Sequence, residues 1–176
     1  MSDGAIIVTG SASGIGRACT AMLLERDARV AAFDIQSEKL EAEFPGEIRN
    51  LLKISGNVAS TADCENAVKS TLDKFGALDA LIHWGAAHSS ATWDELDAEE
   101  CTRTLEVNVT GSFLISQAVA THMVGQGKGS IVLCTSTSVL YGVTGGQGQG
   151  GPAYVASKGA IIALTRSLAR ALGPKG

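Results

Sequence analysis

The sequence has 176 residues and a mass of 18.0 kDa, of which 45% are hydrophobic and 18% charged. This length and composition describe one folded domain and exclude an intrinsically disordered chain. The net charge of −4, without any run of lysine or arginine, argues against nucleic acid as the main partner.

The cysteines and histidines lack the spacings that are typical of disulfide frameworks and metal sites. Without a CxxC pair, reduced thiols of a cytoplasmic protein are expected at Cys19, Cys64, Cys101 and Cys134. Without HxxxH or HExxH spacing, no metal is expected at His83, His88 or His122. The N-terminus has no signal-peptide pattern, and no apolar run reaches about 20 residues, so we expect a cytoplasmic protein with no membrane contact.

In the first half of the chain, short apolar runs alternate with helical patterns. The apolar runs predict strands over residues 5–9 and 29–33, and a mixed pattern predicts a third strand over residues 48–54. Helices are expected over residues 15–26, 37–43 and 60–75, with Ser37 as the N-cap of the second.

The same alternation continues in the second half. Strands are predicted over residues 78–83 and 130–135, a long helix over 97–123, and a last helix from Pro152 or Ala153 to Leu172. The segment 142–151 has six glycines in ten residues and is expected to be a mobile loop. Strands that alternate with helices predict an α/β fold, a doubly wound parallel sheet in one domain over residues 1–176.

A glycine-rich turn follows the first strand, in the order Thr9-Gly-Ser-Ala-Ser-Gly-Ile-Gly16. Glycines let the backbone approach a pyrophosphate, and the N-terminus of the next helix offers free N–H groups to it. The spacing is GxxxGxG and not GxGxxG, and glycines that serve only packing give the same pattern. The candidate cofactor-binding residues of this turn are Gly10, Ser13, Gly14, Ile15 and Gly16.

Asp34 stands 18 residues after Gly16, at the end of the second strand. A carboxylate there can accept hydrogen bonds from ribose hydroxyls and repels a 2′-phosphate, which favours NAD over NADP. The alternative is that Asp34 only caps the following turn. Arg17 is a possible complication, but it stands inside the start of the first helix and is expected to face solvent.

Tyr154 and Lys158 are four residues apart in the last predicted helix and therefore lie on one face of it. A phenol has a pKa near 10, and a fixed ammonium close by lowers it. The pair could move a proton to or from an alcohol or ketone. The alternative is a half-exposed tyrosine beside a solvated lysine.

Taken in order with Asn108 in Asn-Val-Thr-Gly and a serine after the fifth strand, these motifs resemble the short-chain dehydrogenase/reductase family. The resemblance implies a Rossmann fold, a nicotinamide cofactor and hydride transfer centred on Tyr154 as the general acid/base. It also implies that Lys158 binds the nicotinamide ribose and that Asn108 holds a water that relays protons to Lys158. For Asn108, a bond to its own helix is the alternative.

The orienting serine that the resemblance implies is Ser136, which matches when the fifth strand is aligned. It precedes Tyr154 by 18 residues, because the glycine-rich segment looks inserted, and a loop absorbs insertions readily. Ser138 is the competing candidate.

Two segments depart from the family pattern. The usual Asn-Asn-Ala-Gly is replaced by His83-Trp-Gly-Ala, where Gly85 keeps a backbone contact to the cofactor and His83 could replace one asparagine. The usual Asp-Val that binds adenine is replaced by Asn57-Val58, whose side-chain carbonyl can still accept that bond.

The family pattern continues beyond Gly176 through two further strands, so the strand at 130–135 is expected to be an open edge of the sheet. The resemblance predicts an NAD-dependent oxidoreductase that interconverts a secondary alcohol and a ketone, assembled as a homodimer or homotetramer. The alternative is a truncated, non-catalytic NAD-binding module, or an inactive fragment that needs a partner or the missing segment.

Overall fold

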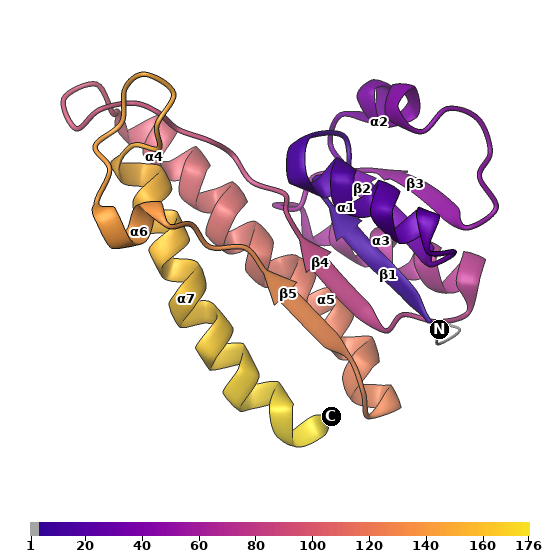
Figure 1. Ribbon diagram of the computed structural model, residues 1–176. Helices are drawn as coiled ribbons and strands as arrows, with labels where there is room; N and C mark the ends of the chain where they lie inside the picture. Colours follow the sequence, from indigo (N-terminus) through magenta and orange to yellow (C-terminus); the bar gives the residue numbers. More distant parts are fainter. Residues whose placement is uncertain (1–3) are drawn as a thin grey trace.

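The computed structural model describes residues 4–176, which form a five-stranded parallel sheet with the strand order β3-β2-β1-β4-β5 (Figure 1). The predicted doubly wound α/β fold is confirmed. The strands are β1 (Ala5–Thr9), β2 (Arg29–Asp34), β3 (Leu51–Ser55), β4 (Ala80–His83) and β5 (Ser130–Leu133).

Helices cover both faces of this sheet. They are α1 (Gly14–Glu25), α2 (Ser37–Glu43), α3 (Thr61–Phe75), α4 (Ala98–Leu105), α5 (Gly111–Gln126), α6 (Ser138–Tyr141) and α7 (Pro152–Leu172). Successive side chains of β1 point to opposite faces, as the pleat requires. Val8 therefore packs with α1 and α2, whereas Ile7 packs with α3 and α5. The helix α7 lies beyond β5, against α4 and α5 (Figure 1).

The helix ends depend on local capping chemistry. Ser60 is the N-cap of α3, and its hydroxyl accepts the N–H of Asp63 at 3.3 Å. Gly76 ends this helix in the left-handed conformation that glycine adopts without strain, with φ of 69°. The prediction for α2 is wrong in one detail: Ser37 is the first helical residue, and Gln36 holds the N-cap position without a side-chain bond.

Three strands are shorter than predicted. β3 begins at Leu51, because the residues before it turn back and Leu51 N–H donates to the carbonyl of Ile48 at 2.9 Å. β4 begins at Ala80, although Leu78 before it is buried in the core. β5 ends at Leu133, because the carbonyl of Cys134 accepts a bond from Lys158 and not from a strand.

The single long helix predicted over residues 97–123 is two α-helices joined by a π-helical segment, Glu106–Thr110. π-Helical turns are rare, and those that occur inside α-helices are often found at functional sites. This segment contains Asn108, one of the candidate catalytic residues.

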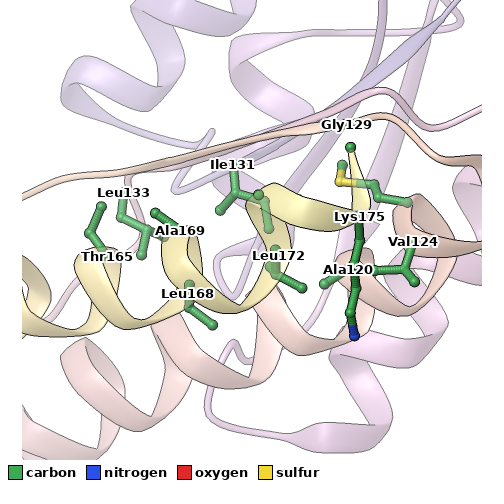
Figure 2. A pocket seen from close by; sticks show the side chains of 13 residues that line it. Ala120, Val124, Gly129, Ile131, Leu133, Thr165, Leu168, Ala169, Leu172 and Lys175 are labelled. Carbon is green, nitrogen blue, oxygen red and sulfur yellow. The ribbon is translucent and has the colours of Figure 1, made fainter.

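β5 is the outer strand of the sheet, as expected, and Val132 on it is 47% exposed. An apolar groove of about 240 Å³ lies between β5 and the C-terminal halves of α5 and α7. Figure 2 shows Ile131, Leu168 and Leu172 lining it. Within residues 4–176, no helix combines the length and apolar character that a membrane crossing requires.

The glycine-rich segment 142–151, predicted to be mobile, is hydrogen-bonded to the loop that follows β4. Gly146 N–H donates to the carbonyl of Ser90 at 2.7 Å, and Gly151 N–H donates to that of Ser89 at 2.8 Å. A Cβ on Gly151 would lie 2.0 Å from the carbonyl oxygen of Ala91, so only glycine permits this approach. The two loops therefore form one structural unit.

Candidate functional site

A cleft of about 650 Å³ opens at the carboxyl ends of β1, β2 and β4, where ligands bind in open α/β sheets. All of the residues predicted to bind the cofactor line this cleft, although they come from distant parts of the chain. They are Gly10, Ser13, Gly14, Ile15, Gly16, Asp34, Asn57, Val58, Gly85, Tyr154 and Lys158.

The glycine-rich turn is shaped for close backbone approach. Gly10 has φ of +71°, and a Cβ there would lie 2.9 Å from the backbone nitrogen of Gly85. A Cβ on Gly16 would lie 2.2 Å from the carbonyl oxygen of Gly10. Ser13, the N-cap of α1, makes no side-chain cap, so the first-turn N–H groups stay free. This cradle fits the pyrophosphate of a dinucleotide.

The carboxylate of Asp34 is buried and held by two backbone amides. One oxygen accepts the N–H of Ala12 at 2.9 Å, and the other accepts the N–H of Gln36 at 2.9 Å. The bond from Gln36 is the turn cap that the alternative interpretation of Asp34 predicts. The bond from Ala12 connects Asp34 to the glycine-rich turn. Each oxygen keeps a lone pair that a ribose hydroxyl could use.

The segment after β3 lines the cleft near the expected adenine position. The side-chain oxygen of Asn57 already accepts the N–H of Ala59 at 2.9 Å, so an adenine amine would have to use its second lone pair. Val58 packs so closely on α5 that a Cβ on Gly111 would lie 2.9 Å from it. Trp84 also lines the cleft, and its indole N–H has no partner among residues 4–176.

Lys158 lies beneath the ring of Tyr154, with its ammonium 5.6 Å from the ring centroid. The residue is 5% exposed, and its Nζ donates to the carbonyl of Cys134 at 3.0 Å. Burial lowers the pKa of Lys158, because a low-dielectric environment disfavours the charged form. The ammonium keeps two N–H groups for other partners. Lys158 is therefore buried, and the alternative interpretation of a solvated lysine beside Tyr154 is wrong.

Asn108 does not line the cleft, and its side chain joins two other segments. Its oxygen accepts the N–H of Ala87 at 2.7 Å, while its amide group donates to the carbonyl of Ala87 and to the hydroxyl of Ser157, both at 2.9 Å. The side chain is therefore not bonded to its own helix. Since both amide hydrogens are used, a water at Asn108 would need an oxygen lone pair.

The two candidate serines are bonded to each other. The hydroxyl oxygen of Ser136 accepts the N–H of Ser138 at 3.2 Å and its hydroxyl at 2.9 Å. The hydroxyl hydrogen of Ser136 therefore remains available to a substrate oxygen, whereas that of Ser138 is used.

His83 joins β4 to β1. Its Nδ1 lies 2.7 Å from the hydroxyl of Thr9, which in turn accepts the N–H of Gly85 at 3.0 Å. Burial, and to a lesser extent the charge of Lys158, together lower the pKa of His83 to about 3, so the ring is neutral at physiological pH. Within the described part of the chain, Nε2 is buried without a partner.

Sequence reasoning missed three contributors to the site. Ser157, beside Lys158, fixes Asn108, and its place inside the Tyr154-to-Lys158 turn was a usable signal. The carbonyl of Cys134 and the indole of Trp84 left no comparable signal, because their roles depend on tertiary contacts.

The family model described as short chain dehydrogenase matches residues 4–176. The chain belongs to this family. A curated relative, (2S)-[(R)-hydroxy(phenyl)methyl]succinyl-CoA dehydrogenase subunit BbsD of Thauera aromatica, is 34% identical over 97% of this chain and 67% of its own length. The 2-(R)-hydroxypropyl-CoM dehydrogenase of Xanthobacter autotrophicus is 35% identical over 93% of this chain and 66% of its own.

The 3-oxoacyl-[acyl-carrier-protein] reductase FabG of Thermotoga maritima is 32% identical, over 94% of this chain and 67% of its own length. The crystal structure of gox2181 superposes with a TM-score of 0.89 at 28% identity, covering 100% of this chain and 69% of that one. The chain thus spans about two thirds of the length of these relatives.

No group of three or more histidine, cysteine, aspartate or glutamate side chains that could hold a metal occurs among residues 4–176. The four cysteines are free thiols, and Cys64 is the buried one. Burial raises the pKa of Cys64 to about 11, which leaves it protonated and unreactive.

Proposed function

We propose that this protein is an NAD-dependent oxidoreductase that interconverts a secondary alcohol and a ketone by hydride transfer. One observation carries this function: Tyr154, with the buried Lys158 beneath its ring, lines the same cleft as the glycine-rich turn and Asp34. Relatives whose names are dehydrogenase and reductase support the reaction class.

Bound NAD would supply the hydride acceptor for alcohol oxidation, and NADH the donor for the reverse reaction. Tyr154 takes the proton of the substrate hydroxyl during oxidation and returns it during reduction. Lys158 favours the phenolate with its positive charge and has N–H groups left for a ribose hydroxyl. Ser136 donates its free hydroxyl hydrogen to the substrate oxygen and orients it.

A preference for NAD over NADP follows from the charges around Asp34. Its carboxylate is fixed at the end of β2 and repels a 2′-phosphate. Arg17, on the first turn of α1, is 2.9 Å from the carboxylate of Glu43 and is thus already paired. An NADP-binding site would instead present a free cation here.

The test is whether the chain oxidises secondary alcohols. With NAD and a panel that includes cyclohexanol and 1,2-cyclohexanediol, we expect NADH to accumulate, and slower turnover with NADP. A chain that neither oxidises any alcohol of the panel nor binds NADH would contradict this function.

A non-catalytic NAD-binding module is the second candidate. The exposed edge of β5 and the apolar groove beside it favour this function. They leave part of the sheet next to the proposed active site uncovered. NADH titration, followed by the fluorescence of Trp84 in the cleft, separates the candidates. Saturable binding without turnover of any alcohol would support the module, and turnover would exclude it.

We also propose that the chain forms a homodimer or homotetramer through α5 and α7. Phe113 on α5 is 40% exposed, which leaves apolar area available for such an interface. Sedimentation equilibrium of the chain should give a dimer or tetramer mass, and a monomer at all concentrations would contradict this.

A further inference from the structure

The loop after β4 holds His88 in a fixed position. On one side, Asn108 binds both the N–H and the carbonyl of Ala87, at 2.7 and 2.9 Å. On the other side, the carbonyl of Ser89 accepts the N–H of Gly151 at 2.8 Å. Because the backbone is anchored before and after His88, its side chain is presented from a rigid base.

This fixed imidazole lies against the ring of the proposed acid/base residue. The ring centroids of His88 and Tyr154 are 4.9 Å apart, with an interplanar angle of 47°. His88 is exposed, and within the described residues neither ring nitrogen has a hydrogen-bond partner. An exposed imidazole on an anchored backbone, in contact with the ring of the proposed acid/base residue, is placed to bind the substrate.

The glycine-rich loop packs on the same tyrosine. A Cβ on Gly150 would lie 2.5 Å from Cδ1 of Tyr154, so the bare backbone of Gly150 contacts the ring directly. This loop is fixed to the loop that carries His88 through the bond between Gly146 and Ser90. Both loops therefore set the position of Tyr154 relative to His88.

We propose that His88 is a specificity-determining residue that hydrogen-bonds a second oxygen of the substrate, on the carbon next to the reacting one. A neutral imidazole donates one N–H and accepts at the other nitrogen, so either a hydroxyl or a carbonyl oxygen can pair with it. The preferred substrates are then vicinal diols and the matching hydroxy ketones. This inference rests on the proposed function of Tyr154.

An NMR experiment tests it without turnover. The chain has three histidines, and His88→Phe identifies the imidazole nitrogen signals of His88 by their loss. In the presence of NADH, which cannot accept a hydride from an alcohol, 1,2-cyclohexanediol is added to one sample and cyclohexanol to another. We expect the nitrogen signals of His88 to shift with the diol and to remain in place with cyclohexanol. Signals that do not respond to the diol would overturn the inference.

Kinetics give a second readout. His88→Phe keeps an aromatic ring against Tyr154 and removes both nitrogens. We expect the ratio of kcat/KM for the diol to that for cyclohexanol to fall about tenfold, the effect of one hydrogen bond to the substrate. His122→Phe, the same change on α5, should leave the ratio unchanged.

The outcomes separate this inference from the function on which it rests. An unchanged ratio in the His88→Phe enzyme, with cyclohexanol still oxidised, would overturn the role of His88 and leave the oxidoreductase function standing. A wild-type chain that neither binds NADH nor oxidises either alcohol would overturn both.

Discussion

The ammonium of Lys158 donates to the carbonyl of Cys134 at 3.0 Å and lies 5.6 Å from the ring centroid of Tyr154. A buried lysine is costly, because burial disfavours its charge, and this lysine has one hydrogen bond in return. The fold therefore gains little from Lys158, which favours a role in the chemistry of the cleft.

Lys158→Met tests that role. Removal of the buried charge offsets the lost bond to Cys134, so the free energy of unfolding should change by less than about 1 kcal/mol. Turnover should fall by roughly 10²-fold or more, because the phenolate of Tyr154 loses its neighbouring cation. Urea unfolding and steady-state kinetics measure the two effects. Lys39→Met, on the exposed side of α2, should change neither, and a large stability loss in Lys158→Met with normal turnover would contradict the assigned role.

Asp34→Asn tests the cofactor preference. The carboxylate accepts from two backbone amides, whereas an asparagine has one oxygen and would present its NH₂ group to one of those donors. We expect NADH to bind about tenfold more weakly or worse, and the affinity of NADPH relative to NADH to rise. Fluorescence titration with both cofactors gives the ratio. Glu38→Gln, an exposed acid-to-amide change on α2, is the control, and an unaltered ratio in Asp34→Asn would argue against the ribose contact.

His83 should make the free energy of unfolding of the chain depend on pH in the acidic range. Its pKa is about 3 in the folded state and about 6.5 in an unfolded chain, so between these values the unfolded state binds one more proton. The free energy of unfolding therefore falls as the pH decreases, by about 1.4 kcal/mol per pH unit from this residue.

His83→Asn removes that titration. Urea unfolding at several pH values between about 6 and 4 should give a shallower pH dependence in the variant, and the difference from wild type should approach the slope for one proton. Equal slopes in the two proteins would show that His83 is protonated in the folded state or exposed.

Gly150→Ala should displace the ring of Tyr154, since the new Cβ would lie 2.5 Å from Cδ1. A shift of about 1 Å in a reacting group can cost roughly 10²-fold in rate, so we expect turnover to fall much more than NADH affinity. Gly125→Ala, in α5, meets no atom within 4 Å and serves as the matched control. Normal turnover in Gly150→Ala would show that the loop does not constrain Tyr154.

The sequence was sufficient to predict the sheet and the residues of the cleft, because both follow from local rules. The apolar run of β1 and the glycines after it predict a buried strand that ends at a phosphate-binding turn. Asp34 follows a second such strand, and the carboxyl ends of neighbouring parallel strands share one edge of the sheet. Residues at the carboxyl ends of these strands therefore lie close together, regardless of the length or sequence of the connecting loops.

The remaining features depend on contacts between distant segments. The hydrophobic periodicity of the predicted long helix does not indicate the π-helical turn at Asn108. The side-chain amide of Asn108 binds Ala87, which is 21 residues away in the sequence. The bond between His83 and Thr9 spans 74 residues, so the spacing of neither residue could indicate it. The side-chain oxygen of Asn57 accepts the N–H of Ala59 in a local turn and would therefore be shared with adenine, which the spacing of Asn57 in the sequence did not indicate.

The most direct test of the central claim is Tyr154→Phe, which removes one oxygen and leaves the ring. Turnover of cyclohexanol and NADH affinity are measured for wild type, for Tyr154→Phe and for Tyr141→Phe, the same change at the exposed tyrosine of α6. We expect Tyr154→Phe to lose about 10²- to 10⁴-fold in turnover while it keeps most of its NADH affinity, and Tyr141→Phe to match wild type. Turnover by the Tyr154→Phe protein at the wild-type rate would contradict the assignment of Tyr154 as the acid/base.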